Sequence, residues 1–110
     1  PFNSVVVNRY SSGDDHLAYH ADNERSIVTR STIASLSMGQ ERDFQIKPLA
    51  SPVDGEPRPK PITMTLGSGD LLLMSQDAQK VAHHGVPKRA NSKVPGTRYN
   101  LTFRLLHRKK

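Results

Sequence analysis

Residues Arg98–Leu106, with the sequence RYNLTFRLL, alternate more regularly than any other part of the chain. One side of the alternation carries the larger apolar side chains Tyr99, Leu101, Phe103 and Leu105. The other side carries Arg98, Asn100, Thr102, Arg104 and Leu106. A period of two residues predicts a β-strand. The polar side either faces solvent or points into a barrel, where it would line a site for an anion, and the alternation alone does not decide between these.

Working outward from this strand, short strand-like segments recur along the chain and are separated by turn residues. They are Ser4–Tyr10, His16–Asp22, Thr32–Met38, Arg42–Ile46, Ile62–Leu66 and Leu71–Met74. We expect the continuous apolar run Leu71–Met74 to be buried on both faces, and Gly39-Gln40 to turn a hairpin. No segment convincingly predicts a helix, and residues 76–82 are polar and ambiguous. This pattern predicts an all-β sandwich or barrel.

Composition limits the classes to which the chain can belong. A length of 110 residues is that of one domain with a modest core, which we expect to be aliphatic because aromatic residues are few and Trp is absent. The chain has no Cys, which excludes disulfides and thiolate sites. We find neither a signal peptide nor an apolar run that could span a membrane. A formal net charge of +6 indicates either a polyanionic partner such as nucleic acid or a solubilising surface.

Two stretches of the sequence predict loops. Lys47–Pro61 contains five prolines, which exclude regular structure, and Lys88–Pro95 is basic and rich in turn residues. Arg58 and Lys60 in the first loop could contact a phosphate backbone, but the loop composition favours a solvated loop over this.

His20-Ala21-Asp22 is the first candidate for chemistry. In an extended segment, residues two positions apart share a face, and Leu17 and Tyr19 would face the opposite way. Two His and one carboxylate are the ligand set of non-heme Fe(II) oxygenases. A third ligand would have to come from far along the chain, and either His83 or His84 could supply it.

Four short motifs, in order, give a more specific indication. They are Asn8-Arg9-Tyr10, His20-Ala21-Asp22, His84-Gly85-Val86 and Arg98–Arg104. They match the N-x-Y, H-x-D, H-[GS]-[VI] and R-x-N-x-T-F-R motifs of the AlkB family of Fe(II)- and 2-oxoglutarate-dependent nucleic-acid dealkylases. The chain resembles this family over nearly its whole length. The resemblance implies a double-stranded β-helix, or jelly roll.

The resemblance also assigns roles to residues. It selects His84 over His83 and implies that Fe(II) is bound by His20, Asp22 and His84. Arg98 would pair with the distal carboxylate of 2-oxoglutarate, and Arg104 would lie near the iron, contacting the other carboxylate or steadying Asp22. Help in binding the cosubstrate would come from Tyr10 and from Asn8 or Asn100.

For the substrate, the resemblance implies methylated DNA or RNA whose target base is flipped out or single-stranded. Glu24 would help to recognise the damaged base. Natural contacts to phosphates are Arg58, Lys60, Lys88 and Arg89. The family couples decarboxylation of 2-oxoglutarate by O2 to hydroxylation of an N-methyl group, which leaves as formaldehyde. We therefore expect Fe(II), 2-oxoglutarate and O2 as cofactor and cosubstrates.

One departure from the family concerns the start of the chain. Members usually carry an N-terminal extension that forms a lid over the nucleotide, and it would precede Pro1. We therefore expect residues 1–110 to be a single catalytic domain without that lid, monomeric and not membrane-bound. Compact domains of this type also occur in polyproteins of plant RNA viruses. The expected location is intracellular: the nucleus or cytoplasm, or the host cytoplasm if the source is viral.

Two alternatives remain open at this stage. The iron chemistry could act on a protein side chain or a small molecule, and the basic charge argues only mildly against this. The chain could also be a nucleic-acid-binding module with a silent site. The intact His, Asp and Arg set argues against a silent site, because buried charges cost free energy to desolvate.

Overall fold

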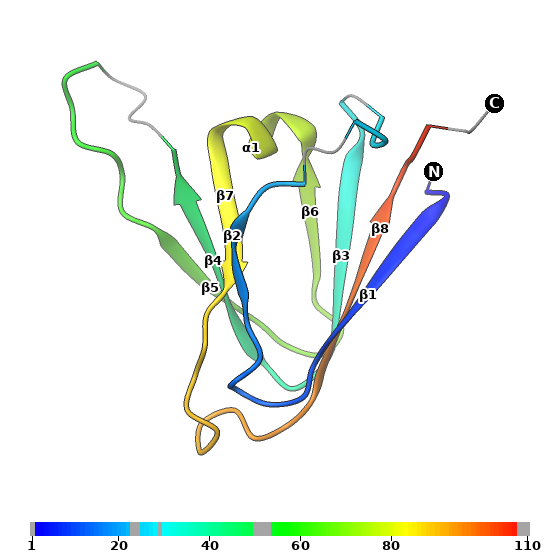
Figure 1. The fold of residues 1–110 in the computed structure, drawn as a ribbon, viewed down its shortest axis with the longest axis vertical. Coiled ribbons are helices and arrows are strands. Elements are labelled where there is room, and N and C mark those ends of the chain that lie inside the picture. Colours follow the sequence, from blue (N-terminus) through cyan, green and yellow to red (C-terminus); the bar gives the residue numbers. More distant parts are fainter. Residues whose placement is uncertain (1, 23–24, 29, 50–53, 108–110) are drawn as a thin grey trace.

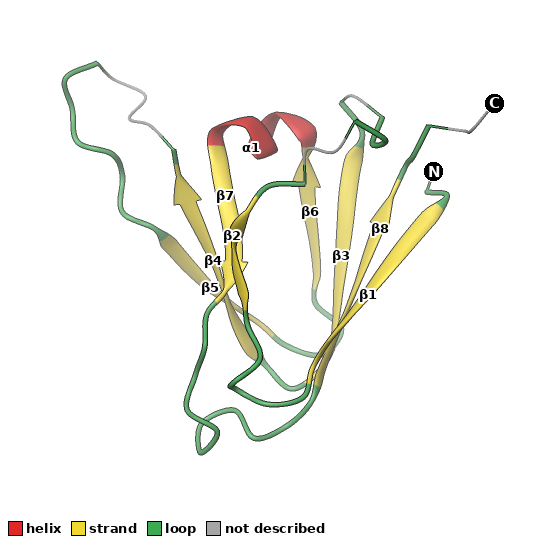
Figure 2. Cartoon of the chain, viewed as in Figure 1, coloured by secondary structure: helices red, strands yellow, loops and turns green. Residues whose placement is uncertain are grey.

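Eight strands and one short helix make up the part of the chain that the computed structural model describes, namely residues 2–22, 25–28, 30–49 and 54–107 (Figures 1 and 2). No helix among these residues is long and apolar enough to cross a membrane. The elements are β1 (Ser4–Tyr10), β2 (Leu17–His20), β3 (Thr32–Gly39), β4 (Arg42–Pro48), β5 (Ile62–Leu66), β6 (Leu71–Ser75), α1 (Gln76–Val81), β7 (Ala82–Val86) and β8 (Arg98–Arg104).

The strands form two antiparallel sheets of four strands each. Their orders are β1-β8-β3-β6 and β2-β7-β4-β5. Figure 1 shows the sheets facing each other, close together at the end crossed by residues 87–97 and spread apart at the end that carries α1. The chain moves repeatedly from one sheet to the other, which is the arrangement of a jelly roll. The predicted all-β jelly roll is therefore confirmed.

The central strand β8 settles which way its polar side chains point. Arg98, Asn100 and Thr102 are buried, whereas Tyr99 on the opposite side is 42% exposed. β8 pairs with β1 on one edge and with β3 on the other, so its inward face lies at the middle of the sheet. Of the two possibilities that the alternation left open, the polar side therefore faces the interior.

The predicted hairpin at Gly39-Gln40 is wrong. β3 pairs with β6 and β8, whereas β4 pairs with β5 and β7 in the other sheet. Gly39 has φ +89°, and a Cβ there would lie 2.4 Å from the carbonyl oxygen of Thr97. The glycine thus supports a tight crossing between sheets, which local turn signals alone do not distinguish from a hairpin.

The run Leu71–Met74 is not buried on both faces, as the sequence had suggested. It belongs to β6, at the edge of its sheet, where Leu71 is 58% and Leu73 is 62% exposed. Leu72 and Met74 face inward and pack against the core. A continuous apolar run does not reveal whether a second layer covers its outer face.

The helix α1 was not predicted. Ser75 caps it, with its Oγ accepting a hydrogen bond from the Ala78 backbone N–H, and Asp77 and Lys80 lie in the first and last turns. These are helix start and stop signals, but six residues are too few to show helical periodicity. The helix joins β6 to β7 and so links the two sheets.

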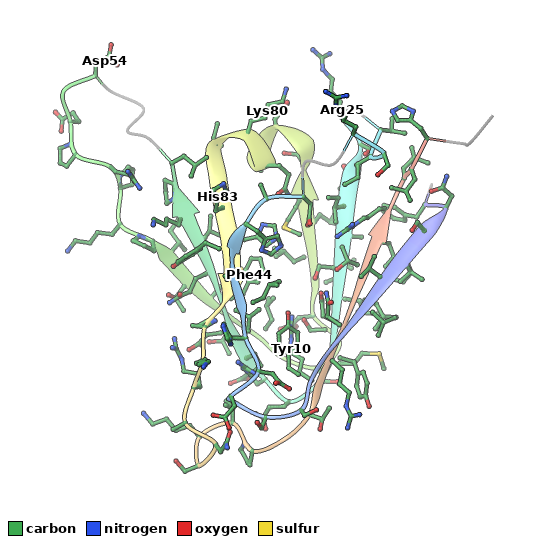
Figure 3. The ribbon with its side chains drawn as sticks, viewed as in Figure 1. Tyr10, Arg25, Phe44, Asp54, Lys80 and His83 are labelled. Atoms are coloured by element: carbon green, nitrogen blue, oxygen red, sulfur yellow. The ribbon has the colours of Figure 1, made fainter. Side chains whose placement is uncertain are left out.

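The apolar core lies between the sheets and is small. Tyr10, Phe44, Leu66 and Val86 form its centre. Figure 3 shows Tyr10 and Phe44 pointing into the space between the sheets. The expected aliphatic core is thus wrong, because two of the few aromatic residues lie at its centre.

Arg42, at the start of β4, joins the loops at the closed end of the sandwich. It is 2% exposed. Its guanidinium donates hydrogen bonds to the carbonyl oxygens of Ser12 (3.0 Å), Asp15 (2.9 Å) and Pro87 (2.9 Å). It also lies over the ring of Tyr10, with Cζ 5.5 Å from the centroid. One side chain therefore ties the β1–β2 and β7–β8 connections to β4.

We expect an Arg42→Met substitution to lower the free energy of unfolding by at least about 3 kcal/mol, because it leaves several carbonyl groups without their donor. Urea unfolding followed by circular dichroism measures this. Arg89→Met is the matched control, because Arg89 is about one third exposed and pairs with Asp43. Its loss should cost less than about 1 kcal/mol. Equal effects of the two substitutions would contradict the role of Arg42.

Candidate metal centre and anion pocket

His20, Asp22 and His84 come together between the two sheets. One ligand atom from each lies within 4.8 Å of the others. His20 ends β2 and pairs directly with His84 of β7, and Asp22 follows two residues later. Asp22 Oδ1 is 3.8 Å from His20 Nε2, and Asp22 Oδ2 is 3.5 Å from His84 Nε2. Asp22 and His84 are 62 positions apart in the sequence and lie together in one cluster, as the motifs had suggested.

Neighbouring groups set the orientation of both imidazoles. His20 Nδ1 lies 2.9 Å from the carbonyl oxygen of Ala18, and its Nε2 faces Asp22. The ring of His84 stacks on Phe44, with centroids 5.5 Å apart. The two imidazoles meet edge to face at 4.3 Å. Both Nε2 atoms therefore face the same carboxylate.

A β-bulge explains one error in the prediction for this segment. The pairing of β2 with β7 shifts register between Leu17 and His20. Leu17, expected on the opposite side, therefore lines the same cavity as His20 and Asp22. A bulge adds one residue to a strand and so shifts its alternation, which the period-two pattern does not show.

Asp22 is buried but held in its charged form. Burial alone would raise the pKa of its carboxyl. Hydrogen bonding to His84, the charge of Arg104 and the two imidazoles outweigh burial, so the pKa of Asp22 lies below its ordinary value. Arg104 Nη2 donates to Asp22 Oδ1 at 3.1 Å. The structure therefore places Arg104 on Asp22, one of the two positions expected for it.

This lowered pKa predicts how stability depends on pH. Ionised Asp22 stabilises the folded chain above its ordinary pKa, and the contribution is lost as the pH falls through the lower, folded-state pKa. We expect the wild-type chain to have a higher free energy of unfolding than Asp22→Asn at neutral pH. This difference should shrink in acid. Urea unfolding in metal-free buffer at a series of pH values measures it. A difference that is constant with pH would contradict the assignment.

Arg98 presents unused hydrogen-bond donors inside the cavity. It is 2% exposed, and its Nη2 donates to Ser37 Oγ at 2.9 Å. Its Nε and Nη1 are buried and have no hydrogen-bond partner among the described residues. Burial lowers the pKa of the guanidinium, but an arginine stays protonated in proteins. Buried cationic donors of this kind match the carboxylate of a small ligand.

The other residues predicted to bind the cosubstrate line the same cavity as Arg98, and they differ in how many hydrogen bonds they already make within the protein. The Arg98 Cζ is 5.2 Å from the ring centroid of Tyr10. Burial raises the pKa of the Tyr10 phenol, so it remains a hydrogen-bond donor. Asn100 also lines the cavity, but its amide donates to Ser35 Oγ at 2.6 Å and accepts from Thr102 Oγ1 at 3.0 Å. Asn8 lines the same cavity from β1.

The predicted substrate contacts are more scattered. Glu24 lies outside the described residues. Arg58 and Lys60 are exposed on the segment that projects beside β5, and Lys88 is exposed on the separate connection after β7 (Figure 1). Arg89 Nε donates to Asp43 Oδ2 at 2.9 Å, so its charge is already paired within the protein. The described positions lie on two separate connections of the chain, and their contact with a substrate remains a prediction.

Several residues of the site went unnoticed in the sequence. Ser35, Phe44 and Met74 line the cavity, and Gln79 of α1 accepts a hydrogen bond from the Asp22 backbone. The alternation of Ser35 and Ser37 in β3 was a usable signal of a polar interior. Nothing local marked Gln79, because its partner lies 57 residues away.

Comparison with known proteins identifies the family. Residues 1–104 match the family described as the 2OG-Fe(II) oxygenase superfamily. The chain belongs to this superfamily. The match spans all eight strands of the sandwich and every residue of the candidate metal centre.

Individual relatives confirm the AlkB resemblance within the superfamily. "DNA oxidative demethylase ALKBH2" of Arabidopsis thaliana is 39% identical over 96% of this chain and 38% of its own length. "Alpha-ketoglutarate-dependent dioxygenase alkB homolog 3" of Homo sapiens is 34% identical over 96% of this chain and 37% of its own length. The solved structure of OsALKBH1 superposes with a TM-score of 0.64 at 25% identity, covering 92% of this chain and 47% of that one. The chain thus spans less than half the length of each of these proteins.

The residues present fit the groups that the superfamily implies, which are Fe(II), 2-oxoglutarate and O2. Two imidazole nitrogens and one carboxylate, with the second nitrogen of His20 already engaged, are a suitable donor set for Fe(II). The unpartnered donors of Arg98 suit one carboxylate of a diacid. His20, Asp22 and His84 would hold the metal, and Arg98 would hold the cosubstrate.

Proposed function

We propose that this domain is an Fe(II)- and 2-oxoglutarate-dependent dioxygenase that removes N-methyl groups from bases in DNA or RNA. The observation that carries the proposal is the two-His, one-carboxylate cluster facing the same cavity as the buried donors of Arg98. A metal ligand set and an anion site within one cavity are what a reaction between a chelated diacid and oxygen requires.

The proposed reaction uses both atoms of O2. One atom of O2 enters succinate as 2-oxoglutarate loses CO2, and the other becomes the hydroxyl group on the substrate methyl carbon. The C–N bond of the resulting hydroxymethyl group then breaks, giving formaldehyde and a base with a restored N–H or ring nitrogen. When bound, iron and 2-oxoglutarate supply the oxidising chemistry.

The residues of the chain hold this chemistry in place. His20, Asp22 and His84 would hold the metal, and three protein ligands are the number that leaves such a metal able to take up the diacid and O2. His84 and Arg104 lower the pKa of the Asp22 carboxyl, and Arg104 also orients it through a hydrogen bond. Phe44 packs against His84 and forms an apolar wall on that side of the cavity. Arg98 would fix the far end of the diacid.

Support for a nucleic-acid substrate comes from the relatives and from the charge of the chain. The ALKBH2 proteins are named as DNA demethylases, and the formal net charge of +6 suits a polyanion. A modified base would have to leave its stack to reach a cavity enclosed between two sheets.

The test is turnover of 2-oxoglutarate to succinate with Fe(II) and ascorbate, with and without an oligonucleotide carrying 1-methyladenine or 3-methylcytosine, with formaldehyde followed in parallel. Stimulated succinate and matching formaldehyde are expected. Succinate without stimulation would move the proposal to a protein or small-molecule substrate. Absence of succinate from a metal-loaded protein would overturn it.

A further inference from the structure

Helix α1 buries one polar side chain among otherwise exposed neighbours. Gln79 is 4% exposed, whereas Asp77, Ala78, Lys80 and Val81 are exposed. An apolar residue would satisfy an inward-facing position of a short helix at lower cost. A buried amide costs free energy unless its polar atoms find partners. The contacts of Gln79 therefore indicate why a glutamine occupies this position.

Those contacts lead directly to the candidate metal centre. Gln79 Oε1 accepts a buried hydrogen bond of 2.9 Å from the backbone N–H of Asp22. Its Nε2 faces Met74 Sδ at 3.9 Å, and Met74 lines the same cavity as the metal ligands. The side chain thus joins α1 to the main chain that carries the only carboxylate of the three-residue cluster.

The hydrogen bond from Gln79 acts on a part of the main chain that lies beyond the end of β2. The strand runs only to His20, so the ladder with β7 does not reach Asp22. His84 and Arg104 contact the oxygens of the Asp22 side chain, whereas Gln79 bonds to its backbone N–H. Gln79 therefore supplies a restraint at Asp22 that neither the sheet nor the ion pairs provide.

The helix itself is anchored at both ends, so it can act as a fixed support. Ser75 caps its start, and the backbone N–H of Leu49, just after β4, donates to the carbonyl oxygen of Val81 at 2.9 Å. A group projected from an element held in this way can fix another group to the sub-ångström tolerance that a metal site requires.

We propose that Gln79 is a positioning residue of the metal centre, which acts through the backbone of Asp22 to hold its carboxylate in place for the metal. This rests on the proposed function only in assuming that the cluster binds a divalent metal. Gln79 does not contact the metal, the cosubstrate or the substrate in this role.

Two substitutions at one position separate this role from simple packing. Gln79→Met keeps the length and shape of the side chain but removes the acceptor for the Asp22 N–H. Gln79→Glu keeps an acceptor. The control is Lys80→Met, on the same helix, where the exposed Lys80 pairs with Asp77 at 3.9 Å. Lys80 is labelled in Figure 3, where it points away from the sandwich.

The measurement is the affinity of the protein for Mn(II) alone, from the free-ion electron paramagnetic resonance signal, alongside thermal melting of the metal-free protein. Gln79→Met should weaken Mn(II) binding by about 10- to 100-fold, the usual effect of losing a group that orients a metal ligand. Gln79→Glu should bind Mn(II) at least as tightly as the wild-type protein, and Lys80→Met should match it within about twofold.

The outcomes distinguish the proposals. Wild-type affinity in Gln79→Met would overturn the role of Gln79 while leaving the metal centre intact. If Gln79→Met is unfolded at the assay temperature, Gln79→Glu decides: restored affinity supports the role, and a loss in a folded Glu variant overturns it. A wild-type protein that binds no Mn(II) would instead refute the metal centre on which the proposed function depends.

Discussion

An Asp22→Ala variant will lose 2-oxoglutarate turnover and will bind Mn(II) more than about a hundredfold more weakly than the wild-type protein. Loss of a group that only orients a metal ligand already lowers metal affinity by about 10- to 100-fold, so loss of the ligand itself should cost more. Asp22 supplies the single carboxylate of the cluster, and both imidazoles face it. Its removal also deletes the carboxylate to which Arg104 donates, so an ion pair beside the metal centre is lost together with the ligand. Succinate release and Mn(II) titration measure the two effects.

The matched control for this substitution is Asp43→Ala. Asp43 is also paired with an arginine, but its partner Arg89 lies outside the cavity and both side chains are about one third exposed. The control should keep wild-type turnover. Binding of an oligonucleotide should survive in Asp22→Ala, because contacts between basic side chains and phosphates dominate the affinity for nucleic acid, and the metal does not. Full turnover in Asp22→Ala would show that the ligand assignment is wrong.

The parts of this site that could be predicted from the sequence share a physical property. Each is carried by a strand whose side-chain direction follows from its period of two, or by a motif with a fixed spacing. Arg98, Asn100 and Thr102 share one face of β8 for that reason. The pairing of His20 with His84 was available only through the family motifs, because nothing in the local sequence specifies which strands become neighbours.

The parts that could not be predicted depend on tertiary contacts. Arg42 looks like an ordinary charged residue in a strand, yet it is buried because three carbonyl groups from two distant loops converge on it. The crossing at Gly39 resembles a hairpin turn until the partners of β3 and β4 are known. Gln79 gains its function from an N–H that is distant in sequence. In each case a long-range hydrogen bond or strand pairing overrides the local signal.

Arg98→Lys should raise the KM for 2-oxoglutarate by about 10- to 100-fold, which corresponds to roughly 1.4 to 2.8 kcal/mol, while Mn(II) affinity stays unchanged. Lysine keeps the positive charge but not the planar fork of donors, so a carboxylate that is gripped at two points would be held at one. Nε and Nη1 of Arg98 are buried donors that have no partner among the described residues, and the single nitrogen of lysine cannot reproduce their fork.

The KM and the Mn(II) affinity report separately on the cosubstrate site and on the metal centre, because Arg98 is not part of the metal cluster. Arg9→Lys on β1 is the matched control: Arg9 lies next to this strand, opposite Tyr99 in the β1–β8 ladder, but is exposed. It should leave the KM within about twofold of wild type, since substitutions at exposed positions rarely matter. An unchanged KM in Arg98→Lys would mean that the diacid is held elsewhere, whereas a matching loss of Mn(II) affinity would mean that Arg98 supports the fold of the cavity as a whole. A change confined to the KM would identify the inward face of β8 as the surface that holds the cosubstrate, which is the reason for a buried polar face on a central strand.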